Sequence, residues 1–321
     1  MISQSDWLTV LCYHRIGNPD QDSSCSYRPN FSASIENFAR QMKIVSTLFT
    51  PVSLREVAQS LATGASLPKR PALITFDDGY KDNGYVAWPI MRDLGIPGVV
   101  FLATDHIGTG KPFIWDYAAY CIQNACADRA CIPLLGSRNL SSLQDRYAST
   151  IAWVEASKRL PAEQRWPAAE ALASALGILP PQSAFSGLYL SWDEVRQLAR
   201  EGLEFGGHTC SHPILTRLPV AAARKEIIEC QERLTAELGR PAIGFAYPNG
   251  STKDYDDGHE CAVYEAGFAI AFTLEPGPSR LYEVSERPTA VRRIDVGSKD
   301  NIPRLMAKFV GAARLASSWK H

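Results

Sequence analysis

The sequence predicts an α/β fold, either a barrel or a wound sheet, from two observations. Short and nearly continuous apolar runs alternate with longer segments of helical periodicity, a pattern typical of parallel strands buried on both faces. The chain has 321 residues, of which 45% are hydrophobic and 21% charged. This composition excludes a disordered chain, and α/β barrels routinely reach this length as one unit. Elements that alternate in this way are joined by right-handed crossovers.

Local signals support the predicted elements. Ser191 and Glu194 form a capping box at the start of one helix, and Gly239 with Pro241 ends another at Leu238. The predicted strands are Trp7 to Tyr13, Ala72 to Phe76, Gly98 to Ala103, Leu203 to Gly206, Ala242 to Ala246 and Phe268 to Thr273, and the predicted helices are residues 35–46, 54–63, 84–94, 191–201, 220–238 and 258–266.

Two segments depart from this alternation. From about residue 105 to 181 the chain is rich in helix formers and shows no convincing strand, so we predict a helical insertion within one domain that spans residues 1–321. The segment from about 302 to 315 is amphipathic and predicts a C-terminal helix packed on the main fold. A helix lying on a membrane surface is the alternative.

Composition and charge exclude several classes of function. Lys and Arg number 33 and Asp and Glu 34, for a net charge of −1, so no basic excess favours nucleic acid as a partner. The most apolar run, Val99 to Ala103, is far too short to cross a membrane. Residues 1–7 have neither a basic start nor an apolar stretch, so we expect a cytoplasmic protein without a signal peptide, unless a leader was trimmed. No two of the eight cysteines are separated by two residues, and reduced thiols are expected.

Two adjacent carboxylates follow the second predicted strand. The segment Thr75 to Tyr80 reads TFDDGY and places Asp77 and Asp78 at the carboxyl end of the strand, where α/β barrels build their active sites. Ionising both carboxyls in one tight turn is costly unless a cation or hydrogen-bond donors compensate. The alternative is structural, with one carboxylate capping the next helix and the other facing solvent.

Two histidines follow the fourth predicted strand. Gly206 to Pro213 reads GGHTCSHP and spaces His208 and His212 four residues apart, which on a helical turn puts both imidazoles on one side. With one of the aspartates they form a set of one carboxylate and two imidazoles for a divalent metal. Three protein ligands leave coordination positions open for water, which is typical of a catalytic rather than a structural metal site.

A third turn follows the fifth predicted strand. Phe245 to Gly250 reads FAYPNG, and its Pro and Gly fix a turn that can point a backbone N–H toward an oxyanion. The same sequence also suits an ordinary turn, so its interpretation depends on the two motifs above.

These three segments, in this order, resemble the polysaccharide deacetylases (carbohydrate esterase family four, with the NodB-like fold) over about residues 8–277. The resemblance implies a distorted (β/α)7-type barrel that forms a single catalytic domain. By position, Asp77 corresponds to the family's catalytic base, and Asp78, His208 and His212 correspond to the ligands of a zinc-type metal. Asn249 corresponds to the residue whose backbone amide helps to bind the oxyanion.

This chain departs from the family pattern at two positions, so two of the family's roles are expected to fall to other residues. The family's third motif has an arginine where this chain has Ala246, and the late histidine that donates a proton is missing. A branch that acts on exopolysaccharides such as poly-N-acetylglucosamine carries that histidine in an early strand, and here Tyr13 to Ile16 (YHRI) is such a strand end. We therefore predict His14 as the general acid, with a structural core histidine as the alternative, and Arg293 as the residue that holds Asp77.

The resemblance implies a metal-dependent hydrolase that removes N-acetyl groups from amino sugars of a poly- or oligosaccharide. Zn²⁺ is the expected metal, with Co²⁺, Ni²⁺ or Fe²⁺ as alternatives. The expected partner is an N-acetylated glycan contacted by Tyr247, Pro248 and Tyr80, and Trp115 and Trp192 are further candidates for stacking on a sugar. Two other functions stay open: hydrolysis of another non-peptide C–N bond, such as a formamide or cyclic amide, and a carbohydrate-binding relic without activity.

Overall fold

Parallel strands close into a seven-membered barrel in the computed structural model, which describes residues 7–22 and 25–310. This confirms the predicted (β/α)7-type barrel. The ring runs through β1 (Trp7–Tyr13), β13 (Val291–Asp295), β11 (Ile270–Pro276), β10 (Gly244–Ala246), β9 (Glu204–Gly207), β6 (Gly98–Leu102) and β5 (Pro71–Phe76), and the pairing of β5 with β1 closes it.

The barrel strands contribute side chains alternately to two hydrophobic clusters, because successive residues of a strand point to opposite faces. Val10, Leu73 and Phe101 belong to the cluster that fills the barrel interior. Leu11 and Ile74, their neighbours in β1 and β5, belong to the cluster that packs beneath the surrounding helices. Both faces of the strands are therefore buried, which explains why the strands read as continuous apolar runs.

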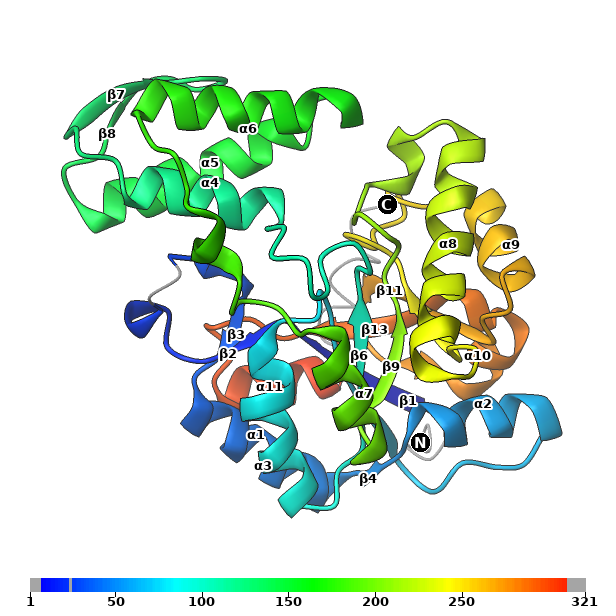
Figure 1. Ribbon diagram of the computed structural model, residues 1–321. Coiled ribbons are helices and arrows are strands. Elements are labelled where there is room, and N and C mark those ends of the chain that lie inside the picture. The colour runs from blue at the N-terminus through cyan, green and yellow to red at the C-terminus, as the bar shows by residue number, and fades with distance from the viewer. Residues whose placement is uncertain (1–6, 23–24, 311–321) are drawn as a thin grey trace, which may run out of the picture.

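Helices surround the barrel (Figure 1). The Ser191–Glu194 capping box is present at the start of α7, and Gly239, with φ of 70°, ends α8 as predicted. The predicted helix 84–94 is instead a π-helical turn, Asn83–Ala87, followed by a short α-helix. The helices around the barrel are α1 (Ile35–Leu48), α2 (Leu54–Thr63), α3 (Trp88–Asp93), α7 (Trp192–Arg200), α8 (Val220–Leu238), α9 (Asp257–Glu265), α10 (Leu281–Glu286) and α11 (Ile302–Phe309).

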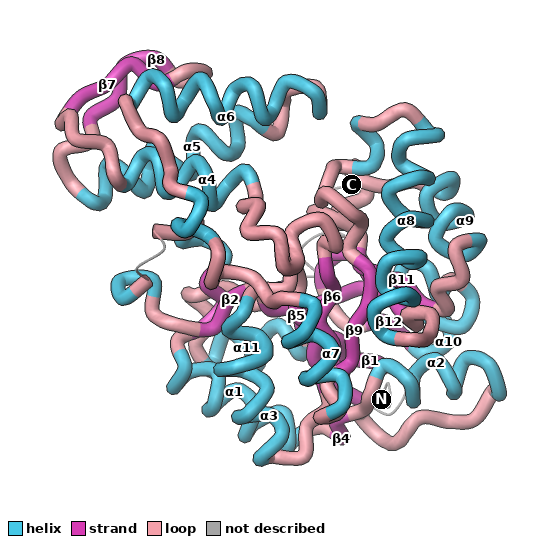
Figure 2. The backbone as a smooth tube through the Cα atoms, viewed as in Figure 1, coloured by secondary structure: helices cyan, strands magenta, loops and turns pink. Residues whose placement is uncertain are grey.

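An insertion between β6 and α7 stands to one side of the barrel (Figure 2). It contains α4 (Ile114–Gln123), α5 (Leu143–Ser157) and α6 (Ala162–Leu176), which share a hydrophobic core around the fully buried Trp153. The prediction of an insertion without strands is wrong in one respect. An antiparallel hairpin, β7 (Arg129–Ile132) and β8 (Gly136–Asn139), lies within it, and its mostly exposed polar residues give no hydrophobic alternation to detect.

Several short strands were also not predicted. β13 was missed because Arg292 and Arg293 interrupt its apolar run. α11 agrees with the predicted C-terminal helix as far as Phe309, and residues 311–315 of that prediction lie outside the described residues. None of the described helices is both long and apolar enough to span a membrane. The remaining unpredicted strands are β2 (Arg15–Ile16), β3 (Phe31–Ala33), β4 (Thr50–Pro51) and β12 (Ser279–Arg280).

Candidate active site at the carboxyl ends of the strands

A cleft of about 540 Å³ opens at the carboxyl ends of the barrel strands, and α5 of the insertion forms one of its walls. Parallel strands bring their carboxyl ends to the same side of a barrel, so motifs far apart in the sequence meet there. The predicted site residues that line the cleft are His14, Asp77, Asp78, His208, His212 and Asn249.

Asp78, His208 and His212 converge on one point. The Nε2 atoms of His208 and His212 lie 3.7 and 3.5 Å from Asp78 Oδ1, and the two imidazole rings have centroids 4.7 Å apart. One ligand atom from each of the three residues lies within 4.8 Å of the others. The structure therefore brings these residues together as expected from the sequence, although Asp78 and His208 lie 130 positions apart along the chain.

The surroundings of these three residues suit a divalent cation. His208 Nδ1–H donates to the Ala246 carbonyl at 2.6 Å, which leaves Nε2 as an acceptor. Burial lowers the pKa of His208 to about 4, and burial together with His208 lowers the pKa of His212 well below its usual range, so both imidazoles are neutral. Asp78 Oδ1 is buried without a hydrogen-bond donor, and burial with the nearby Asp77 raises the carboxyl's pKa well above its usual range. Such an orphaned oxygen beside two neutral imidazoles fits a zinc-type ion.

The backbone at these motifs adopts rarely populated conformations. Asp78, Thr209, His212 and Asn249 all have positive φ, between 58° and 76°. Each costs of order 1–3 kcal/mol for a residue other than glycine, and such residues cluster at functional sites. Gly79 follows with φ of 77°, and a Cβ there would lie 2.7 Å from Leu102 Cδ2. The turns are thus held by packing in shapes that aim their polar groups into the cleft.

Asp77 lies beside this cluster but pairs with a different partner. Arg293 donates to it through both Nη atoms, at 2.7 Å each, and also donates Nε–H to the Thr273 carbonyl. Burial alone would raise the pKa of Asp77, but the Arg293 guanidinium holds the pKa well below its usual range. Asp77 is therefore ionised, and the guanidinium fixes the orientation of its carboxylate. This contact is the one predicted for Arg293.

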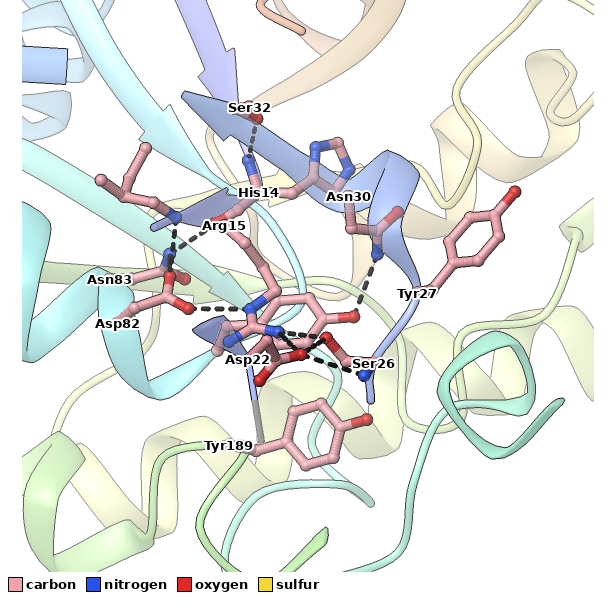
Figure 3. Close-up of polar contacts among 12 residues, drawn as sticks. His14, Arg15, Asp22, Ser26, Tyr27, Asn30, Ser32, Asp82, Asn83 and Tyr189 are labelled. Carbon is pink, nitrogen blue, oxygen red and sulfur yellow. Dashed lines mark hydrogen bonds and ion pairs between the residues drawn. The ribbon is translucent and has the colours of Figure 1, made fainter. Parts of the chain in front are cut away.

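His14 follows β1, and its backbone is fixed on both sides. Its N–H donates to Ser32 Oγ at 2.9 Å, and its carbonyl accepts from Asn83 Nδ2 at 2.6 Å. Behind it, Arg15 lies between Asp82 on one side and Asp22 with Ser26 on the other (Figure 3). This buried arginine ties the loop between β2 and β3 to the barrel, so His14 emerges into the cleft from a rigid strand end.

Asn249 lies at the cleft with φ of 58°. Within the described chain its backbone N–H has no hydrogen-bond partner, whereas the following Gly250 N–H donates to the Pro248 carbonyl at 2.7 Å. A backbone N–H left free beside a cluster of metal-type ligands is available to a ligand oxygen.

Trp115 of α4 reaches from the insertion to the cleft. Its ring stacks on Phe113, with centroids 4.4 Å apart, and meets the His212 ring edge-on at 4.9 Å. Its Nε1–H donates to Tyr80 Oη at 2.9 Å, and Tyr80 in turn donates to the buried Asp116 carboxylate at 2.8 Å. The insertion thus places a fixed aromatic face next to a candidate metal ligand.

The predicted substrate contacts of Tyr80, Tyr247 and Pro248 do not agree with the structure. Both tyrosine rings have no exposed surface, and Pro248 is buried as well. Tyr247 donates its hydroxyl to the Thr289 carbonyl and stacks on Tyr255 at 4.3 Å. A ring without an exposed face cannot stack on a sugar, so these residues support the site from within the core. Trp192 is buried as well and does not line the cleft.

Other residues lining the cleft were not foreseen from the sequence. Tyr27 and Asn30 come from the loop between β2 and β3, and Glu155, Lys158 and Arg159 come from the last turn of α5 and the residues that follow it. No motif marks them, because the loop and the helix reach the cleft only through the tertiary fold. The charged residues at the end of α5 are the one sequence feature that could have indicated a contact with the cleft. The same pattern occurs at any helix end that faces solvent.

Solved structures share this fold along nearly the whole chain. PplD, a deacetylase from Streptococcus pyogenes solved in complex with acetate, gives a TM-score of 0.62 at 15% identity and covers 94% of this chain and 98% of its own. IcaB from Ammonifex degensii gives 0.60 at 20% identity, with 96% and 99% covered. The BpsB deacetylase domain from Bordetella bronchiseptica gives 0.56 at 17% identity, with 92% and 98% covered.

The sequence itself matches a family profile. No curated protein sequence matches the chain, but the profile described as polysaccharide deacetylase matches residues 64–270, more than half of its length. The matched region contains both aspartates, both histidines and Asn249. It confirms the resemblance drawn from the three motifs, and the chain therefore belongs to the polysaccharide deacetylase family.

Proposed function

We propose that this protein is a metal-dependent hydrolase that removes N-acetyl groups from the amino sugars of a poly- or oligosaccharide. The proposal rests on two adjacent carboxyl groups whose surroundings favour opposite protonation states. Asp78 is buried without a donor beside two neutral imidazoles, while Asp77 is held ionised by Arg293. One suits a metal ligand and the other a general base. Pairs of acids whose surroundings push their pKa values apart mark acid–base sites.

Asp78, His208 and His212 would hold the metal. When bound, a divalent ion supplies Lewis acidity, which makes water a better nucleophile near neutral pH and polarises a carbonyl. Zn²⁺ is the proposed ion, because a carboxylate with two imidazoles is a common ligand set for catalytic zinc. The Ala246 carbonyl orients the His208 ring by accepting from Nδ1–H, and such outer contacts fix the nitrogen that faces the metal.

Asp77 is the proposed general base. It accepts a proton from the attacking water while Arg293 keeps the carboxylate in place, since a two-point guanidinium pair prevents rotation of the acid. The Asn249 N–H is proposed to donate to the oxyanion that develops on the amide oxygen. One such donor is typically worth roughly 3 kcal/mol of transition-state stabilisation.

His14 is the proposed general acid. The amide nitrogen leaves only as a neutral amine, so a proton has to reach it as the C–N bond breaks. His14 lines the cleft together with Asp77, and its backbone is fixed by Ser32 and Asn83. General acid catalysis of this kind contributes about 10²–10⁴-fold. The products are acetate and a free amino sugar.

The cleft supports a glycan rather than a small apolar amide as the substrate. Its lining combines Trp115 with four charged residues, Glu155, Lys158, Arg159 and Asp254. Sugars present both apolar ring faces and hydroxyls, which an aromatic ring and charged groups recognise together. We propose that α5 and Trp115 of the insertion select the sugar.

The test is acetate release from N-acetylglucosamine oligomers and other acetylated glycans. We expect release that stops on chelation, returns with Zn²⁺, and falls at least about 10²-fold in Asp77→Asn. A panel of small formamides and cyclic amides is assayed in parallel. Faster turnover of those amides than of any glycan would contradict the proposal, and glycan binding without turnover at saturating Zn²⁺ would favour a non-catalytic protein.

A further inference from the structure

Cys12, His14 and Asp295 form a second cluster of metal-ligating side chains next to the first. One ligand atom from each of the three residues lies within 4.8 Å of the other two. Among the described residues, this is one of two such clusters, and Asp78 with its two histidines is the other. The second cluster contains a sulfur ligand, which the first one lacks.

The sheet register places these three residues together. Cys12 of β1 is the register partner of Asp295 of β13, and the Val296 N–H donates to the Cys12 carbonyl at 2.9 Å. His14 follows Cys12 by two residues, and residues two apart on a strand share a face. Cys12 and Asp295 therefore lie on two adjacent barrel strands and His14 directly follows one of them, and strands hold ligands more rigidly than loops do.

The ligand set and its burial suit a thiophilic ion. Cys12 has no exposed surface and forms no disulfide, His14 is half-buried at the cleft, and Asp295 is exposed. The exposed Asp295 carboxylate would be the first ligand that an ion meets on its way to the buried thiol, which now donates to Asp77 Oδ2 at 3.5 Å. Ligand–zinc distances of about 2.0–2.3 Å imply ligand atoms roughly 3.3–3.8 Å apart in a tetrahedral site. The three ligand atoms, which lie within 4.8 Å of one another, would approach by up to about 1 Å on binding.

We infer that Cys12, His14 and Asp295 bind a second divalent ion of thiophilic character, such as Zn²⁺ or Cd²⁺, and that its binding inhibits the enzyme. The Cys12 thiol loses its proton to solvent as the sulfur–metal bond forms, and nothing is oxidised or reduced. The His14 nitrogen that binds the ion can no longer deliver a proton. The binding itself stands independently, whereas the inhibition rests on the proposed function of His14.

Titration of the metal-free protein with Co²⁺ tests the binding. Thiolate ligation gives Co²⁺ an intense near-ultraviolet charge-transfer absorption, which a site made of oxygen and nitrogen ligands does not give. We expect this absorption in the wild type as the second equivalent binds, and its loss in Cys12→Ser. Wild-type protein without the absorption at saturating Co²⁺, or a Cys12→Ser variant that keeps it, would overturn the inference.

Two further variants test whether the loss of absorption in Cys12→Ser could come from misfolding, or the absorption itself from another cysteine. Asp295→Asn changes an exposed residue, and we expect it to weaken binding of the second equivalent about tenfold or more. Unchanged affinity in this variant would count against the site. Serine at the three exposed cysteines, Cys126, Cys131 and Cys261, is the matched control and should leave the absorption intact.

Inhibition is measured as the ratio of deacetylation rates at excess and at one equivalent of Zn²⁺. This ratio should fall well below one in the wild type and stay near one in Cys12→Ser, whatever the variant's own basal rate. If the protein releases no acetate at all, the proposed function fails while the Co²⁺ absorption still decides the metal site. If acetate is released and the ratio falls equally in both proteins, the second site is not inhibitory.

Discussion

Arg293 and Asp77 form a two-point ion pair inside the barrel, with Nη1 2.7 Å from Oδ1 and Nη2 2.7 Å from Oδ2. Both side chains are almost fully buried, so the carboxylate is compensated by the guanidinium and not by water. The arginine comes from β13 and the aspartate from the turn after β5, and Arg293 also contacts Thr75 Oγ1 at 3.3 Å. The pair therefore links two barrel strands and sets the charge of the candidate base.

Replacement of Arg293 by lysine should shift the pH dependence of the reaction. Lysine cannot donate two parallel hydrogen bonds, so the pKa of Asp77 rises toward its usual range or above. Because the base acts in its ionised form, the acidic limb of the kcat/KM profile should move to higher pH. The rate at neutral pH should fall about 10–100-fold, as for the loss of a hydrogen bond to a charged group.

Arg292→Lys is the matched control for this change. Arg292 precedes Arg293 on β13, but its side chain is partly exposed and lies 3.9 Å from Glu275. Its replacement should leave the acidic limb where it is. If kcat/KM of Arg293→Lys falls at every pH while the acidic limb stays at the same pH, the arginine supports structure only.

Replacement of His14 by asparagine should slow the hydrolysis of amides more than that of esters. This comparison of two leaving groups distinguishes a role in proton delivery from a structural role. Hydrolysis of an N-acetyl sugar should slow about 10²–10⁴-fold, because the amine needs a proton to leave. Hydrolysis of an aryl acetate should slow about tenfold or less, because a phenolate leaves unprotonated. Rates for both substrates, measured on the same protein sample, check this. Equal losses on amide and ester would contradict the role of general acid.

The cluster of proposed metal ligands was predictable because each signal is local. Two carboxylates after one strand and two imidazoles four residues apart are visible in single segments, and parallel strands then bring the segments to one end of the barrel. Arg293 was predictable only as a position in the family pattern. Its pairing with Asp77 depends on β13, whose two arginines hid the strand itself.

Burial and register were not readable from the sequence. Tyr80 and Tyr247 look like sugar contacts because they adjoin the motifs, yet both rings lie in the core. Cys12 and Asp295 lie close together only because β1 pairs with β13. These two strands come from opposite ends of the chain. Tyr27 and Asn30 reach the cleft from a loop held by Arg15, a contact between residues that no pattern connects.

Asp78→Asn should remove metal-dependent stability without destabilising the metal-free protein. In the absence of metal, Asp78 Oδ1 is buried without a donor, which costs about 1–3 kcal/mol. Asparagine is neutral and nearly the same shape, so the metal-free variant should be as stable as the wild type or more stable. Thermal melts with chelator and with Zn²⁺ check this. A Zn²⁺-induced rise in Tm that is the same in both proteins would contradict the assignment of Asp78 as a ligand.

Trp115→Ala should weaken substrate binding more than chemistry. The ring lines the cleft beside His212, and loss of an aromatic face should raise KM about threefold to tenfold. Trp115→Phe should restore most of the affinity. Trp166→Ala is the matched control, since Trp166 lies in the same insertion, packs edge-on against Tyr117 at 5.6 Å and does not line this cleft. Equal effects of the two alanine variants would point to damage of the whole insertion.

His106 should make the fold sensitive to acid. Its ring is buried, stacks on Phe113 with centroids 3.9 Å apart, and hydrogen-bonds through Nδ1 to the Lys111 carbonyl at 2.9 Å. Burial lowers the pKa of His106 from 6.5 to about 4. Between about pH 6.5 and pH 4, His106 is therefore protonated in the unfolded chain but neutral in the folded protein. The free energy of unfolding falls as the pH drops through this window. Between pH 7 and pH 5 this single residue accounts for about 2 kcal/mol of lost stability.

His106→Asn keeps a donor for the Lys111 carbonyl and removes the titrating ring. Urea unfolding of both proteins at pH 7 and pH 5, with chelator present, measures the two free-energy differences. The contribution of His208 is the same in both proteins and cancels, and that of His212 nearly cancels, because burial and His208 lower the pKa of His212 more than His106 does. The wild type should lose about 2 kcal/mol more than the variant between the two pH values. Parallel losses would mean that His106 is protonated in the folded protein at pH 5, which its apolar stacking against Phe113 argues against.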